Sequence, residues 1–166
     1  GCEVVIVPAH TTYEQIMEMK PDGIMLSNGP GDPAENIEVI EELKKLLATK
    51  IPIFGICLGH QLVALATGAK TIKLKYGHRG ANQPVKDLVT GNVYITSQNH
   101  GYAVDSNTLS EDCSVRFINA NDNTCEGIDY QEIPVFTVQF HPEANGGPRD
   151  TMFLFDRFIT LMGGNK

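Results

Sequence analysis

The chain has 166 residues, of which 42% are hydrophobic and 20% are charged. This composition suits one globular domain and excludes a disordered tail, a fibrous repeat and a disulfide-stabilised miniprotein. Thirteen basic and twenty acidic residues give a net charge of −7, which disfavours binding to nucleic acid or to an anionic membrane. The short basic cluster of Lys70, Lys73, Lys75, His78 and Arg79 is a local exception, and we interpret it as a solvated edge.

Strands and helices alternate through the first 70 residues. The β-branched run at residues 3–7 predicts a buried strand. Thr11 and Thr12 precede Gln15 in a capping-box pattern that predicts a helix to about Lys20. The further elements of this half are a strand at residues 24–26, a helix capped by Asp32 with Pro33 as its first residue and Leu47 near its end, a strand at 51–56 and a helix at 58–67.

The pattern changes after residue 70 to shorter strands and turns, followed by one helix. The predicted strands are at residues 92–96, 114–118, 124–129 and 135–139, and the helix is at 150–162. Strands that alternate with helices imply right-handed crossovers and a parallel sheet. We therefore predict one α/β domain over residues 1–166, with a doubly wound, mostly parallel sheet and a short antiparallel extension.

The cysteines and histidines indicate neither a disulfide framework nor a metal site. Four cysteines are present without a C-x-x-C pair, which favours a reducing, cytoplasmic compartment. His60, His78 and His100 have no metal-binding spacing, so we expect structural roles for them and no metal or cofactor in this chain. The apolar stretch at residues 51–69 is interrupted by glycine, proline and polar residues, which favours a strand and a helix over a membrane span.

A nucleophile elbow is predicted at Gly55-Ile56-Cys57-Leu58-Gly59, where an apolar strand turns into a helix. The two glycines leave room for a tight turn that exposes the middle side chain at the end of the sheet. The helix N-terminus favours a thiolate and offers a backbone N–H to an oxyanion. The alternative is that Cys57 is a small buried hydrophobic residue.

A thiol nucleophile needs a base and a group that orients the base. His141 follows the last predicted strand, and Glu143 is two residues further on, across Pro142. Both side chains can project from one strand end toward Cys57, at the sheet edge where sites form in open α/β sheets. The alternative is an ordinary surface or core histidine.

Two further segments follow strands and carry residues suited to ligand binding. Residues 27–33, Ser-Asn-Gly-Pro-Gly-Asp-Pro, contain glycines that allow a close backbone approach to a ligand. No phosphate-binding motif is present there, and a plain turn is the alternative. Residues 98–102, Gln-Asn-His-Gly-Tyr, suit a small polar substrate, although a polar turn is the more frequent explanation.

Three motifs together resemble the signatures of class I, triad-type glutamine amidotransferases. They are GICLGHQ at residues 55–61, SNGPGDP at 27–33 and QFHPE at 139–143. Two further segments, YGHRGANQPVK at 76–86 and TSQNHGYAVD at 96–105, resemble the small, glutamine-hydrolysing subunits of carbamoyl-phosphate synthetases. The resemblance covers essentially the whole chain and implies the flavodoxin-like fold of that family.

The resemblance implies a role for each matching residue. Cys57 attacks the side-chain amide of L-glutamine to form a γ-glutamyl thioester, His141 is the base and then the acid, and Glu143 orients the imidazole. The N–H groups of Leu58 and of the Gly29 region face the oxyanion. The implied glutamine contacts are Gly29, Gly31, Leu58, Gln61, Asn99, Gly101 and Tyr102.

The resemblance also implies a partner. Ammonia passes to the large subunit of the synthetase, which uses bicarbonate, ATP and magnesium to make carbamoyl phosphate for arginine and pyrimidine synthesis. The sequence begins at what resembles the second strand of the family's domain, so it is expected to be truncated at its N-terminus, without the first strand and helix. Apolar surface and unpaired backbone groups should then be exposed.

Other functions stay open at this point. The same elbow serves cysteine hydrolases that act on esters or peptides, and other class I amidotransferases. The chain is also compatible with an inactive module that only docks onto a synthetase partner.

Overall fold

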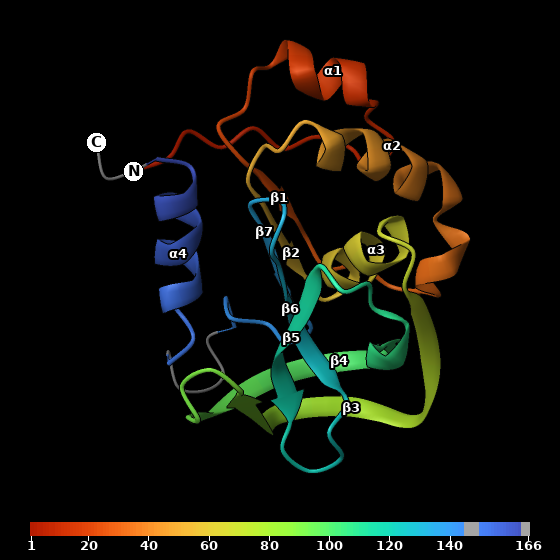
Figure 1. The fold of residues 1–166 in the computed structure, drawn as a ribbon, viewed down its shortest axis with the longest axis vertical. Coiled ribbons are helices and arrows are strands. Elements are labelled where there is room, and N and C mark those ends of the chain that lie inside the picture. Colours follow the sequence, from red (N-terminus) through yellow and green to blue (C-terminus); the bar gives the residue numbers. More distant parts are fainter. Residues whose placement is uncertain (145–149, 164–166) are drawn as a thin grey trace.

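A single mixed sheet organises the chain in this computed structural model, which describes residues 1–144 and 150–163. The sheet has seven strands in the order β1-β2-β7-β6-β5-β3-β4 (Figure 1). The strands are β1 Ile24–Leu26, β2 Ile53–Ile56, β3 Lys70–Asp87, β4 Val93–Asp105, β5 Cys113–Asn119, β6 Cys125–Tyr130 and β7 Val135–Val138.

Helices cover both faces of the first three strands in the sheet order, as a doubly wound fold requires. The helices are α1 Tyr13–Glu18, α2 Ile37–Ala48, α3 Leu58–Ala66 and α4 Phe153–Leu161, with short 3-10 helices at η1 Pro33–Glu35 and η2 Ser106–Thr108. α2 and α3 lie on one face of β1, β2 and β7, and α4 lies on the other (Figure 1). None of the described helices is long and apolar enough to span a membrane.

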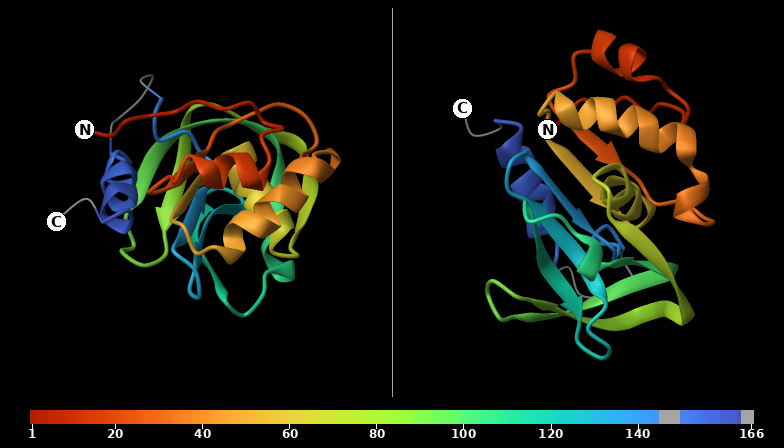
Figure 2. Two further views of the ribbon diagram at one scale, coloured as in Figure 1. Left: turned by 90° about the horizontal axis from the view of Figure 1, so that it is seen from above. Right: turned by 45° about the vertical axis from the view of Figure 1, so that its right-hand side comes forward.

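The α/β class is confirmed, but the antiparallel part is larger than the short extension predicted. Only β1–β2 and β2–β7 are parallel, whereas the other four neighbouring pairs are antiparallel. β3 and β4 form a long ribbon at the end of the molecule away from α1 and α2 (Figure 2). The sequence did not reveal β3 because most of its side chains are polar and partly exposed, and because Gly77 and Gly80 interrupt it with positive φ.

The strand predicted at residues 3–7 is wrong. These residues form no regular secondary structure and pair with none of the described strands. Val4 is 77% exposed and Ile6 is 91% exposed. β1 is therefore the sheet edge, and Met25 within it is also exposed. The exposed apolar surface that we expected from the sequence is therefore observed at residues 3–7. These side chains are exposed because no strand lies beside them in the described part of the chain.

The other elements lie near their predicted positions, except that the strand predicted at residues 92–96 continues to Asp105 in β4. Residues 98–102 therefore lie within a strand and do not form a turn after one. The capping box is confirmed: the Thr12 side chain accepts from the amide of Gln15, and the Gln15 side chain accepts from the amide of Thr12. Asp32 caps a helix as expected, but that helix is the 3-10 turn η1. The predicted single helix is broken at Asn36, whose φ of −85° and ψ of 50° separate η1 from α2.

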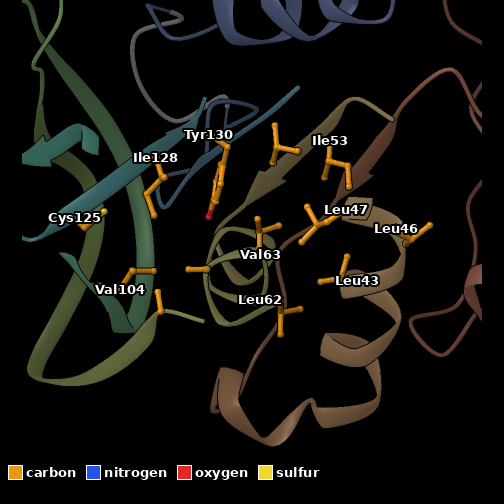
Figure 3. Close-up of a cluster of buried hydrophobic side chains, with 13 residues drawn as sticks. Leu43, Leu46, Leu47, Ile53, Leu62, Val63, Val104, Cys125, Ile128 and Tyr130 are labelled. Carbon is orange, nitrogen blue, oxygen red and sulfur yellow. The ribbon is translucent and has the colours of Figure 1, made fainter. Parts of the chain in front are cut away.

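Successive side chains of β2 point to opposite faces of the sheet and contribute to a hydrophobic core on each face. Ile53 packs with Leu43, Leu47 and Val63 from α2 and α3 (Figure 3). Phe54 points to the other face and belongs to a second cluster, which includes residues of α4. Its ring stacks on Phe136 of β7 at a centroid distance of 4.4 Å. These two clusters hold β2 in place, and β2 carries the predicted elbow at its end.

We expect Phe54→Ala to lower the free energy of unfolding by about 3–5 kcal/mol, because the fully buried ring leaves a cavity between β7 and α4. Urea denaturation of the two proteins measures this difference. Phe153→Ala is the matched control, because Phe153 is partly exposed at the start of α4. Equal losses in the two variants would contradict the assignment of Phe54 to the core.

Candidate active site

Cys57 occupies a strained turn between β2 and α3. Its φ is 53° and its ψ is −103°. Residues other than glycine rarely adopt a positive φ. A Cβ on Gly59 would lie 2.5 Å from the Leu26 carbonyl oxygen, and one on Gly55 would lie 2.9 Å from the Gly59 backbone. The turn therefore requires both glycines, and its geometry is that of a nucleophile elbow.

The backbone around Cys57 presents hydrogen-bond donors at the start of α3. The Cys57 amide donates to Val138 O at 2.9 Å, and its carbonyl accepts from the Gln61 amide at 3.2 Å. Leu58 is the first residue of α3, so its N–H has no partner within the helix. Such an N–H is available to a developing oxyanion.

His141 lies just beyond β7 and is fixed through its backbone and its side chain. Its amide donates to Ser97 O of β4 at 2.9 Å, and the two residues form an isolated antiparallel bridge. Its Nδ1 lies 2.7 Å from Glu143 Oε1. Hydrogen bonding with the Cys57 side chain and then with Glu143 raises the pKa of His141 to about 10. Burial is the largest single influence and acts to raise the pKa of Glu143, but the hydrogen bond and charge of His141, together with a backbone hydrogen bond, lower this pKa overall.

A cavity of about 480 Å³ opens over Cys57. Its walls come from three separate segments of the chain: residues 28–30, residues 97–99 of β4, and His141 with Ala144. Gly29 approaches the elbow so closely that a Cβ there would lie 2.5 Å from Leu58 Cδ2. The structure thus brings Cys57 and His141 together beside Gly29 and Asn99, as the sequence predicted.

The other predicted contact residues do not line this cavity. Gly31, Gly101 and Tyr102 line a separate cavity of about 450 Å³. Gln61 is buried, and its Nε2 donates at 2.8 Å both to Tyr102 O and to Gln139 Oε1. These bonds use both amide hydrogens of Gln61, so Oε1 is the part of this side chain that is left to accept from a ligand.

Two wall residues, Ser97 and Ala144, lie outside the segments that the sequence singled out for ligand binding, and the buried partner Gln139 was not predicted as a site residue. The bridge between Ser97 and His141 joins residues from distant strands, so no local spacing in the sequence reveals it. Gln139 lies within the motif that drew attention to His141, but only its contact with Gln61 shows that it supports the site.

Comparison with known proteins gives consistent similarities. Residues 1–161 match the family described as glutamine amidotransferase class-I. The chain is 57% identical over 166 residues to a carbamoyl phosphate synthase small chain from Fusobacterium nucleatum, covering 99% of this chain and 46% of that protein. It is 59% identical over 161 residues to the small chain from Methanocaldococcus jannaschii, covering 97% and 45%. The chain thus spans about half the length of these relatives.

A solved structure shares the fold. It is a protein from Thermoplasma acidophilum described as a GMP synthase component, with a TM-score of 0.80 and 24% sequence identity. The match covers 96% of this chain and 81% of that one. At this identity the similarity concerns the fold alone.

The raised pKa of His141 leads us to predict how stability depends on pH and how two substitutions change this pKa. Its folded-state value of about 10 exceeds the ordinary value of 6.5, so the imidazolium stabilises the folded chain fully below that ordinary pKa. This contribution is lost as the pH rises through about 10. We expect Glu143→Gln to lower the pKa of His141. The single variant Cys57→Ser should lower this pKa by more than Glu143→Gln does, because the Cys57 interaction is the larger cause of the raised value.

NMR titration of the imidazole ring measures the pKa in each variant. Glu111→Gln is the control, because this exposed carboxylate lies in a turn before β5. A pKa that stays unchanged in Glu143→Gln would show that the carboxylate does not act on the ring.

Proposed function

Because the chain belongs to the class-I glutamine amidotransferase family, we propose that it hydrolyses L-glutamine to glutamate and ammonia, with Cys57 as the nucleophile. The observation that carries this proposal is the elbow at Cys57 facing His141, which is in turn hydrogen-bonded to Glu143 at 2.7 Å. A nucleophile, a base and an orienting carboxylate in this order are the parts that acyl transfer requires.

The first half of the proposed reaction forms the thioester. His141 takes the thiol proton, and the Cys57 sulfur attacks the side-chain amide carbon of glutamine. The carbonyl oxygen becomes an oxyanion, which the Leu58 N–H and an N–H of the loop near Gly29 stabilise. His141 then gives its proton to the amide nitrogen. The C–N bond breaks, ammonia leaves, and the γ-glutamyl group stays bound to sulfur.

The second half releases glutamate. His141 removes a proton from a water molecule that attacks the thioester carbon. The C–S bond breaks, and the proton on His141 returns to the Cys57 sulfur. The elevated pKa of His141 favours the imidazolium while the sulfur is anionic. Glu143 holds the ring through Nδ1 and leaves Nε2 for proton transfer.

The proposed product is used by another polypeptide. We propose that the chain acts as part of a small chain of carbamoyl phosphate synthase in the cytoplasm, supplying ammonia to the large subunit. That partner would bind ATP and magnesium and make carbamoyl phosphate for arginine and pyrimidine synthesis. The support is the identity of 57–59% to small chains across nearly all of this sequence and the cysteines, which are all free thiols.

A chloroketone or diazoketone analogue of glutamine tests the nucleophile and the substrate class together. We expect intact-protein mass to show one adduct per chain, and we expect Cys57→Ser to show none. Ammonia release should fall to background in the same variant, because serine is a much weaker nucleophile in this setting. Free glutamine should slow the labelling by competing for the site.

Cys113→Ser is the matched control, because it removes a partly exposed thiol far from the elbow in sequence. This variant should label and react like the unaltered chain. Labelling by ester probes in preference to the glutamine analogue would instead indicate a different cysteine hydrolase. Binding to a large subunit without any adduct or ammonia release would favour a docking module and contradict the proposed activity.

A further inference from the structure

A second cluster of reactive side chains lies beside the site but is not used by the proposed reaction. It consists of His78 on β3, His100 on β4 and Glu126 on β6, whose ligand atoms all lie within 4.8 Å of one another. His78 and His100 are cross-strand neighbours in the β3–β4 register. Glu126 is 0% exposed, and no described residue forms a hydrogen bond to its Oε2. A buried carboxyl group in this state needs a counter-charge or a proton, and burial raises the pKa of Glu126.

The hydrogen bonds around His100 fix the direction of every donor. The Thr96 hydroxyl donates to Gln83 O at 2.9 Å, so its oxygen accepts from Gln98 Nε2 at 3.1 Å. This orientation turns Gln98 Oε1, an acceptor, toward His100 Nε2 at 2.9 Å. His100 Nδ1 lies 2.7 Å from Tyr102 O, which also can only accept. A neutral imidazole has one N–H and cannot donate to both.

The ring of His78 faces the same conflict. Its Nε2 lies 2.8 Å from Asp122 Oδ2, and its Nδ1 lies 3.1 Å from Glu126 Oε1. Asn119 Nδ2 is 3.5 Å from His78 Nδ1 and 3.4 Å from Glu126 Oε1, which is longer than the usual range for such bonds. With one proton on the His78 ring, a lone pair on the other nitrogen faces a carboxylate.

Each ring thus has a nitrogen lone pair that faces an acceptor. Either one additional proton at each histidine or a single cation bound to both rings removes these two repulsive contacts. A second proton is reasonable on His78, because its ring lies between two carboxylates. It is unfavourable on His100, because this ring is buried and both of its nitrogens face uncharged acceptors. A cation needs lone pairs on His78 Nδ1 and His100 Nε2, which lie 3.1 Å and 3.9 Å from Glu126 Oε1.

We propose that a divalent cation of the zinc class binds His78 Nδ1, His100 Nε2 and the carboxylate of Glu126. Zinc ligands at about 2.1 Å in a tetrahedron lie roughly 3.4 Å apart. The distances from Glu126 Oε1 are 3.1 Å to His78 Nδ1 and 3.9 Å to His100 Nε2, on either side of that value. Two imidazoles and one carboxylate suit zinc better than calcium or magnesium, which prefer oxygen ligands.

The surroundings of the two rings match those of metal-bound histidines. Such histidines almost always donate the other ring N–H to a carboxylate, a backbone carbonyl or water. His78 donates from Nε2 to Asp122, and His100 donates from Nδ1 to Tyr102 O. Gln98 Oε1 is a further oxygen next to His100 Nε2.

The cation has a structural role in this proposal. It joins β3, β4 and β6. β3 and β4 are paired through their backbones, but β6 is separated from β3 by β5 in the sheet. Gln98 and Asn99, the two residues before His100, line the cavity over Cys57. A cation bound to His100 thus holds this wall of the cavity in position.

Cobalt provides a direct test, because Co²⁺ substitutes for zinc and absorbs visible light. The 166-residue chain is stripped with a chelator and titrated with Co²⁺, followed by displacement with Zn²⁺. We expect one equivalent to bind, with d–d bands and without a thiolate charge-transfer band. Glu126→Gln should weaken binding at least about 100-fold, and circular dichroism checks that this variant folds.

Asp122→Asn gives a second variant that leaves the fold intact, because Asp122 is exposed. It should weaken binding about 10-fold through the orientation of His78. His10→Gln removes a surface histidine beside Glu38 and should bind as the unaltered chain does. Equal Co²⁺ affinity in the unaltered chain and Glu126→Gln, an absence of binding, or a strong thiolate band would each overturn the proposal.

Discussion

The close approach of backbone to backbone at the elbow is the constraint on which the rest of the site depends. Gly59 lies against the carbonyl of Leu26 and Gly55 lies against Gly59, so β1, β2 and the start of α3 meet without side chains between them. This contact holds Cys57 at a φ of 53°. The strain at one residue is sustained by packing on both faces of β2, where Ile53 and Phe54 belong to separate cores.

The rest of the site is brought to this fixed point by the curled antiparallel half of the sheet. β4 supplies Ser97 to the backbone bridge with His141 and supplies Asn99 to the cavity wall. Gln61 connects α3 to the same region through Tyr102 O and Gln139. The parallel half therefore carries the thiol and the cavity wall at residues 28–30, and the antiparallel half supplies the wall at residues 97–99 and the backbone contact that holds the base.

The features that the sequence could predict are those determined by neighbouring residues. The elbow glycines, the Thr12–Gln15 capping box and the buried run of β2 each depend on a few consecutive positions. The features that it could not predict depend on partners distant in sequence. Residues 3–7 have the composition of a strand but no neighbour to pair with among the described residues, and β3 has a weak strand composition but gains a long partner in β4.

The same distinction explains the histidines. His141 stood out because Glu143 is two residues away, whereas His78, His100 and Glu126 come from three strands and show no spacing. His78 also belongs to a basic cluster that we interpreted as a solvated edge, but its ring is held between two carboxylates. Pairing of β3 with β4 places the His78 ring there. The composition of the basic cluster does not predict this pairing.

The exposed segment at residues 3–7 presents unpaired apolar side chains to water. They include Val4, Val5 and Ile6, and β1 is a short edge strand with an exposed methionine. Unpaired apolar strands at a sheet edge are templates for pairing between molecules. Self-association through this edge would grow with concentration while the elbow, held by the packing of β2 and α3, kept its local geometry. Loss of material by such association and loss of a formed site would therefore be separate events.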